Sequence, residues 1–369
     1  MRRKPGPWSS PPISPNPPPA ASRATATGSP GISPEQGAVM LQTDNAPNHR
    51  IHGERFMIPS DTDGVQLQLI NKRPVDPVEY SAERTLVMIH GATFPSASLF
   101  DVAVAGASFM DVLARHGYDV WAVDVRGYGG STRLPEMSQP PDDNPPLIPA
   151  RTAVRDLAAA VDFVRRKRGV GRVNLLGMSW GATVAGALAA EAGERFGKLV
   201  LVAPLWLSGT PLRFDSGGPI GAYRIVSPRA FEAAWRAAAP EQERAGLIPE
   251  GWFDAWAEAT LATDAASSAA GTIRAPSGAV LDVRQHWTAG NPLYDPSAIA
   301  NPVLLVCAEW DVDVRFDMAQ DLFTRLTGAR YKRLVEIGRA THMVLMEKNR
   351  GQAFDAVIQF LDEHTVPAG

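Results

Sequence analysis

A regular alternation of short apolar runs with longer amphipathic runs constrains the fold more than any other feature of the sequence. Each short run is apolar on both of its faces, which is typical of a strand buried in a parallel sheet between two layers of helices. The pattern predicts strands at residues 85–90, 119–124, 173–177 and 198–203, and helices at residues 100–116, 153–168 and 182–192. The sequence therefore predicts an α/β fold with a mostly parallel, doubly wound sheet.

An antiparallel hairpin is expected before this alternation, because residues 55–59 and 65–71 are extended runs around a turn-forming Asp61–Gly64 segment. After a long interruption the sheet pattern resumes. It predicts strands at residues 303–308 and 333–337, and helices at residues 317–326 and 351–364.

The chain is expected to have three parts. Residues 1–40 are crowded with Pro, Ser and Ala and lack periodicity, which predicts a disordered tail. Residues 41–204 and 301–369 form the expected α/β core. Residues 205–300 are too long for a crossover loop. They contain helical stretches and no convincing strand, so we expect a helical cap inserted after the sixth strand.

Composition excludes several classes of function. The formal net charge of −3 gives no reason to expect nucleic acid or a membrane surface as partner. The single cysteine, Cys307, lies in an apolar run and is expected to be buried and inert. Since no stretch reaches the roughly 18 apolar residues of a membrane span and no signal peptide is evident, the cytoplasm is the expected location. A small-molecule substrate is expected, and homodimer formation is left open.

The segment Gly177-Met178-Ser179-Trp180-Gly181 is the strongest chemical signal in the chain. It lies directly between a predicted strand and a predicted helix, where a tight turn would present the Ser179 hydroxyl at the edge of the sheet. A serine alcohol is a poor nucleophile without a base. Of the seven histidines, His342 lies in a short loop just past the last predicted strand and is the best candidate for that base.

Two aspartates compete for the acid that orients this histidine. Asp311 and Asp313 both follow the predicted strand at residues 303–308. We favour Asp311, because it comes three residues beyond Ala308, where the strand should end, and the resulting chain order Ser179, Asp311, His342 fits a catalytic triad. Asp313 stays a rival on the same turn. The aspartate that does not bond the imidazole would cap the helix that begins near Asp317.

Residues 55–363 resemble the α/β-hydrolase superfamily of serine esterases and lipases. The motifs that carry the resemblance are His90-Gly91-Ala92-Thr93, Asp124-Val125-Arg126-Gly127-Tyr128-Gly129-Gly130-Ser131 and the Gly177–Gly181 turn. Departures from the family pattern are Ala308, where many members have Gly, and Arg315, where many have Pro.

This resemblance implies a serine nucleophile and an oxyanion hole built from the N–H groups of Trp180 and of either Ala92 or Thr93. The mechanism that it implies requires no metal and no organic cofactor. A pair formed by Arg126 and Asp124 would lock a turn rather than take part in catalysis.

Tryptophans are concentrated in the insertion, which favours an apolar or aromatic ester as substrate. The indoles expected to line the site are Trp206, Trp252, Trp256, Trp287 and Trp310, and Trp180 is also expected to face it. A carboxylic ester hydrolase is therefore the favoured prediction. The alternatives are an amidase or aminopeptidase resembling proline iminopeptidases, a lactonase, thioesterase or carbon–carbon hydrolase with the same triad, and a catalytically inactive binding protein.

Overall fold

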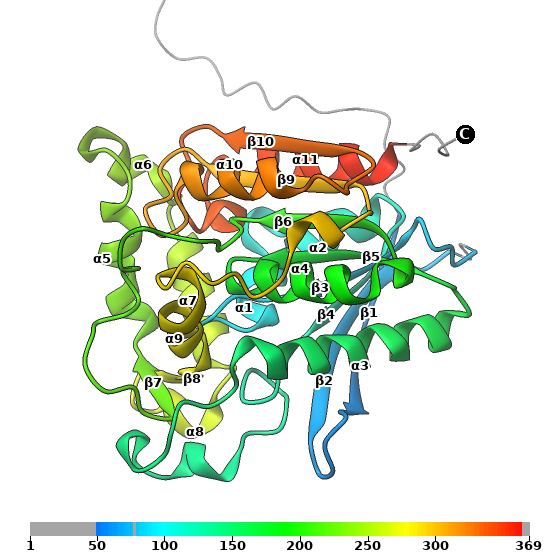
Figure 1. The fold of residues 1–369 in the computed structure, drawn as a ribbon. Coiled ribbons are helices and arrows are strands. Elements are labelled where there is room, and N and C mark those ends of the chain that lie inside the picture. Colours follow the sequence, from blue (N-terminus) through cyan, green and yellow to red (C-terminus); the bar gives the residue numbers. More distant parts are fainter. Residues whose placement is uncertain (1–48, 77–78, 364–369) are drawn as a thin grey trace, which may run out of the picture. The chain divides into compact units, whose positions relative to one another are not determined.

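A computed structural model describes residues 49–76 and 79–363 of the chain. Its centre is an eight-stranded sheet with the strand order β1-β2-β4-β3-β5-β6-β9-β10 (Figure 1). The strands are β1 (Ile51–Pro59), β2 (Gln66–Pro74), β3 (Thr85–Ile89), β4 (Asp119–Val123), β5 (Val173–Met178), β6 (Phe196–Val202), β9 (Val303–Ala308) and β10 (Lys332–Ile337). The predicted tail at residues 1–40 lies outside the described residues.

The pairing of the strands confirms the predicted fold class. The hairpin of β1 and β2 is antiparallel, and β2 pairs antiparallel with β4. Every other pair in this sheet is parallel. Because parallel strands all end at the same edge of a sheet, the loops after β3, β5, β9 and β10 are brought together there.

Successive residues of each central strand enter opposite cores. In β3, Val87 and Ile89 pack into the core on one face, whereas Leu86 and Met88 pack into the core on the other. The first core is covered by α3 (Ala150–Arg168), α4 (Trp180–Ala192) and α10 (Phe316–Arg325), and the second by α2 (Phe109–Arg115) and α11 (Arg350–Asp362). This two-sided burial is the physical reason for the uniformly apolar runs in the sequence.

The single helix predicted at residues 100–116 is wrong. The chain forms a short α1 (Ser96–Phe100) and a separate α2, with a 3-10 turn at Val104–Gly106 between them. Ala105 and Gly106 have φ angles of +49° and +79°, which an α-helix cannot accommodate. A capping box of Ser108 and Asp111 then starts α2 afresh.

The segment between β6 and β9 contains helices, as predicted, but it also contains two strands that were not predicted. Strands β7 (Tyr223–Val226) and β8 (Ile273–Pro276) pair antiparallel in a small separate sheet. Each has only four residues, which is too short to give a recognisable periodicity. The helices are α5 (Pro228–Ala237), α6 (Arg244–Leu247), α7 (Trp252–Leu261), α8 (Ala265–Ser268) and α9 (Gly278–Asp282).

The predicted pair of Arg126 with Asp124 does not form. Arg126 is buried and instead pairs with Asp156 of α3, with its Nε 3.0 Å from both carboxylate oxygens. Asp124 accepts hydrogen bonds from the backbone N–H groups of Ser96 (2.9 Å) and Gly130 (3.1 Å). Two separate polar locks therefore hold the loop after β4.

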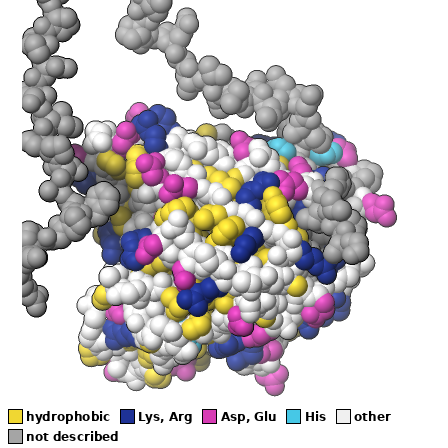
Figure 2. Space-filling view, turned by 45° about the horizontal axis from the view of Figure 1, so that its top comes forward, with side chains coloured by type: hydrophobic (Ala, Val, Ile, Leu, Met, Phe, Trp, Pro, Cys, Tyr) yellow, Lys and Arg dark blue, Asp and Glu magenta, His cyan; other side chains and the backbone are white. Residues whose placement is uncertain are grey.

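The surface of the described residues is mixed in character. On the face seen in Figure 2, hydrophobic side chains lie in groups separated by charged ones. None of the helices in the described ranges has both the length and the apolarity that a bilayer crossing requires.

Candidate active site

Ser179 occupies the turn between β5 and α4, and its backbone is strained. Its φ and ψ angles are +58° and −122°, a conformation that residues with a side chain rarely adopt. The flanking glycines make this turn possible. A Cβ at Gly177 would lie 2.3 Å from the carbonyl oxygen of Gly181, and a Cβ at Gly181 would lie 2.2 Å from that of His90. Only hydrogen fits at either position, so both glycines are required by the packing.

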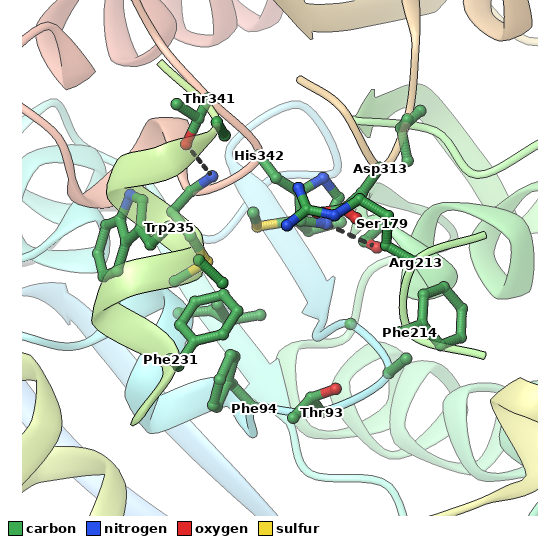
Figure 3. A pocket seen from close by; sticks show the side chains of 18 of the residues that line it. Thr93, Phe94, Ser179, Arg213, Phe214, Phe231, Trp235, Asp313, Thr341 and His342 are labelled. Atoms are coloured by element: carbon green, nitrogen blue, oxygen red, sulfur yellow. Dashed lines mark hydrogen bonds between the residues drawn. The ribbon is translucent and has the colours of Figure 1, made fainter. Parts of the chain in front are cut away.

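Three side chains from three different loops form one hydrogen-bonded chain at this edge of the sheet. The Ser179 hydroxyl lies 3.0 Å from Nε2 of His342 (Figure 3). Nδ1 of His342 lies 2.8 Å from Oδ2 of Asp311. Asp311 follows β9 and His342 follows β10. A proton on Nδ1 satisfies the aspartate, which leaves Nε2 free to accept the serine proton.

The geometry distinguishes between the two aspartates. Asp311 is 6% exposed, and its Oδ1 accepts hydrogen bonds from the backbone N–H groups of Asp313 (2.9 Å) and Val314 (2.8 Å). These bonds aim Oδ2 at the imidazole. Asp313 is half-buried and borders the cavity described below. The helix-capping role predicted for the second aspartate is wrong, because α10 begins after Arg315 without a side-chain cap.

Electrostatics favour a charged imidazole at His342. Burial alone would lower its pKa, but the negative charge and the hydrogen bond of Asp311 outweigh that effect and raise the pKa above its ordinary value. Asp313 and Glu347 contribute in the same direction. Such an environment stabilises the imidazolium that forms when the histidine takes a proton.

Glu347 connects the histidine loop to the insertion, and no pattern in the sequence marks it. This carboxylate is fully buried, and burial raises its pKa. It accepts hydrogen bonds from the backbone N–H of Thr341 (2.8 Å) and from Nε1 of Trp235 in α5 (2.6 Å). Because Thr341 immediately precedes His342, this contact fixes the loop that carries the imidazole.

The loop after β3 lies directly against the serine. A Cβ at Gly91 would be 3.3 Å from Cβ of Ser179. His90 is buried, and burial lowers its pKa; its Nδ1 donates to the Gly91 carbonyl (2.8 Å), while its Nε2 accepts from the N–H of Val125 (3.1 Å). This histidine is therefore a neutral structural link between two loops.

The predicted oxyanion-hole groups lie on the two sides of this contact. Trp180 is the first residue of α4, so its N–H has no acceptor within the helix. Ala92 and Thr93 follow Gly91 and border the cavity. The carbonyl of Ala92 accepts hydrogen bonds from the Tyr128 hydroxyl (2.9 Å) and from Nη2 of Arg224 (2.7 Å), which hold this loop in place.

A cavity of about 300 Å³ opens above Ser179 and His342. Most of the side chains that surround the serine are apolar, and several are aromatic (Figure 3). The aromatic and aliphatic members are Phe94, Leu99, Met178, Leu205, Phe214, Val226, Phe231, Trp235, Val314 and Met343. The charged members, besides His342, are Arg213, Arg224 and Asp313.

The structure corrects the prediction for the tryptophans, because none of the five indoles named from the sequence lines this cavity. Trp206, Trp256 and Trp287 are fully buried between the insertion and the core. The guanidinium carbon of Arg350 lies over the Trp252 ring, 4.6 Å from the ring centroid. Trp310 is half-buried against the second core. These indoles therefore contribute buried apolar area to packing rather than to the lining of the cavity.

Trp180 also differs from the expectation. Its indole is fully buried, and Nε1 donates a 2.8 Å hydrogen bond to Asp282 of α9, a carboxylate whose pKa burial raises to about 6. The indole that does line the cavity among the described residues is Trp235. It lies one helical turn from Phe231 on α5, and that spacing is the signal by which the sequence could have revealed it.

One cluster of potential metal ligands coincides with the site. Asp311, Asp313 and His342 offer ligand atoms that lie within 4.8 Å of one another. The hydrogen bond between Asp311 and His342 already uses one atom of each residue. The cluster is therefore arranged as an acid–base pair.

Comparison with known proteins finds similarity to the α/β-hydrolase fold. The sequence pattern of the family described as "alpha/beta hydrolase fold" matches residues 84–221. No curated protein sequence matches the chain.

Solved structures with similar folds include a meta-cleavage product hydrolase from Pseudomonas fluorescens, with a TM-score of 0.57, 15% identity, and coverage of 83% of this chain and 97% of that one. A bacterial membrane phospholipase A has a TM-score of 0.56 and 17% identity, with coverage of 84% and 86%. An esterase from Thermogutta terrifontis has a TM-score of 0.52 and 16% identity, with coverage of 84% and 98%. Identities this low establish a shared fold and leave the reaction open.

The strain at Ser179 predicts a specific effect on stability. Replacing Ser179 with Gly should relieve backbone strain of about 1–3 kcal/mol, partly offset by about 0.5–1 kcal/mol of added chain entropy in the unfolded state. The matched control is Ser179→Ala, which removes the hydroxyl but keeps the strained Cβ. Urea denaturation should find the glycine variant about 1 kcal/mol more stable than the alanine variant. Equal stabilities would contradict the inference of strain.

Proposed function

We propose, from the shared α/β-hydrolase fold and the family pattern matched by residues 84–221, that the chain is a serine hydrolase acting on carboxylic esters of apolar or aromatic character. The observation that carries the proposal is the hydrogen-bonded chain from Asp311 through His342 to Ser179, which opens onto a largely apolar cavity. Ser179 supplies the attacking hydroxyl, His342 the base that takes its proton, and Asp311 the carboxylate that orients the imidazole.

In the first half of the proposed reaction, Oγ of Ser179 attacks the ester carbonyl while Nε2 of His342 removes the serine proton. Asp311 holds the imidazole in the correct tautomer and stabilises its positive charge. The developing oxyanion is held by the N–H of Trp180 and by that of Ala92 or Thr93. Each such donor is worth on the order of a hundredfold or more in rate.

The tetrahedral intermediate collapses when His342 gives its proton to the leaving alcohol, which produces an acyl-enzyme at Ser179. A water molecule then takes the place of the alcohol. His342 removes a proton from this water, and the resulting attack releases the acid and regenerates the serine. No step requires a metal or an organic cofactor.

The lining of the cavity favours an ester over an aminoacyl substrate. An aminopeptidase needs carboxylates to hold the free amino group of its substrate. The acidic residues of the insertion that could have served lie elsewhere: Glu232 pairs with Arg236, Glu243 pairs with Arg339, and Glu241 and Glu258 are exposed. Phe94, Phe214, Phe231 and Trp235 instead offer an apolar surface for an acyl or alcohol group.

A panel of p-nitrophenyl esters of increasing acyl length, run beside aminoacyl p-nitroanilides, tests the proposal. We expect the esters to be hydrolysed and the anilides to be turned over at least about a hundredfold more slowly, a difference of about 2.7 kcal/mol in activation free energy. Ser179→Ala should abolish ester turnover without unfolding the protein. An alanine variant with near-native activity, or faster turnover of the anilides, would contradict the assignment.

The two aspartates should differ in both rate and pH dependence. Because the charge of Asp311 raises the pKa of His342, Asp311→Asn should lower that pKa and move the rising limb of the kcat/KM profile to lower pH. It should also reduce kcat by about 10⁴-fold. Asp313→Asn, the matched control on the same turn, should reduce kcat by less than about tenfold, since it leaves the hydrogen bond to His342 intact. Equal effects from both variants would exclude Asp311 as the orienting acid.

A further inference from the structure

Arg224 lies where a cation is unexpected, at the wall of a mostly apolar cavity. It is the second residue of β7 and borders the cavity beside the loop after β3. Its Nη2 donates to the carbonyl of Ala92 (2.7 Å) and its Nη1 approaches Oγ1 of Thr93 (3.3 Å). Both acceptors are neutral, and Nε is buried without any hydrogen-bond partner among the described residues.

Arg224 is half-buried, and three other arginines with largely buried side chains have a carboxylate partner. Arg126 pairs with Asp156, Arg168 with Asp119 and Arg274 with Asp264, each at 2.7 Å or less. No described carboxylate forms an ion pair with Arg224, and burial lowers its pKa. A half-buried charge without a counter-ion carries a desolvation cost, and an anion bound from outside the chain would offset that cost.

Arg350 is a useful comparison with Arg224. It is buried, and none of the described carboxylates forms an ion pair with it. Its guanidinium, however, lies over the rings of Trp252 (4.6 Å) and Phe354 (5.4 Å), and cation–π contacts compensate for part of the burial. It does not line the cavity. No such ring contact is found for Arg224 among the described residues, and its open side is the cavity itself.

A second arginine of the insertion borders the same cavity. Arg213 lies in the loop after β6, and Figure 3 shows its side chain extending from the side of Phe214 toward the centre of the cavity. Within the described ranges its side chain has no hydrogen bond and no ion pair. Asp313 is the carboxylate among the residues that border the cavity, so the two guanidinium groups outweigh it in charge.

We propose that Arg224, assisted by Arg213, forms a carboxylate-binding subsite, so that the substrate is an apolar ester carrying a carboxylate away from the bond that is cleaved. The proposal rests on the proposed ester hydrolysis and narrows its substrate class. A planar guanidinium with free second protons on Nη1 and Nη2 matches a carboxylate in two-point geometry. The aromatic residues of α5 would hold the apolar part of the same molecule.

A purely structural role for Arg224 predicts something different. Since Arg224 supports the Ala92 carbonyl, its loss could disturb the oxyanion hole and slow every ester alike. The two accounts are separated by comparing substrates that differ only in charge. The mono-p-nitrophenyl esters of adipate and suberate carry a terminal carboxylate, and the corresponding terminal amides are neutral and nearly isosteric.

The native enzyme should prefer each carboxylate ester over its amide by at least about tenfold in kcat/KM, as expected for a charge-assisted hydrogen bond. Arg224→Gln should reduce this ratio to about one, and Arg224→Lys should leave an intermediate ratio because a point charge replaces the fork. The matched control is Arg229→Gln, which removes an exposed arginine of α5 that pairs with Asp254 and lies outside the cavity. Its ratio should equal that of the native enzyme.

Two outcomes of this comparison would overturn the subsite. One is a native enzyme without preference for the carboxylate esters. The other is an Arg224→Gln variant in which both classes of ester lose activity equally, which would make Arg224 only a support for the Ala92 loop.

Failure of the proposed function is recognised separately. If no ester is turned over, binding of monomethyl adipate to the Ser179→Ala protein and to its Arg224→Gln double variant is measured by calorimetry. Binding that weakens at least about tenfold without Arg224 would support the anion subsite although the hydrolase proposal had failed. Absence of binding, or binding that does not depend on Arg224, would overturn the subsite.

Discussion

The close approach of the β5–α4 turn to the loop after β3 is the constraint on which the rest of the site depends. Gly181 packs against the carbonyl of His90 with room only for hydrogen, and Gly91 packs against Ser179 in return. This contact holds the serine at a φ of +58° and brings the loop after β3 directly beside it. The strain is sustained by the fully buried strands on either side, because relaxing the turn would separate well-packed elements.

The remaining groups reach Ser179 because of the sheet topology. Parallel strands deliver the loops after β9 and β10 to the same edge, so that Asp311 and His342 meet although they are far apart in the sequence. The insertion after β6 then covers this edge with aromatic residues of α5. Glu347 ties that helix to the histidine loop through Trp235 and Thr341. One buried carboxylate thus holds both α5 and the histidine loop.

The fold and the triad geometry could be anticipated because both leave periodic or ordered patterns in the sequence. Apolar runs reveal buried strands, and the motif around Ser179 carries its own structural context. Residue order favoured Asp311 but kept Asp313 as a rival, since the choice depends on two backbone N–H groups that orient one carboxylate. The prediction that the indoles line the cavity was wrong, because the number of tryptophans in the insertion does not indicate which rings face the core. Arg224 and Glu347 are single charged residues whose partners are distant, so no local pattern marks them.

The central claim is that Ser179 is an activated nucleophile, and stoichiometric labelling tests it most directly. The protein is treated with diethyl p-nitrophenyl phosphate, and the modified residue is located by mass spectrometry of its peptides. The account predicts one diethylphosphoryl group per chain on Ser179. Labelling should be absent in Ser179→Ala and strongly slowed in His342→Ala, which lacks the base. Modification of a different residue, or a folded protein that is not labelled at all, would contradict the account.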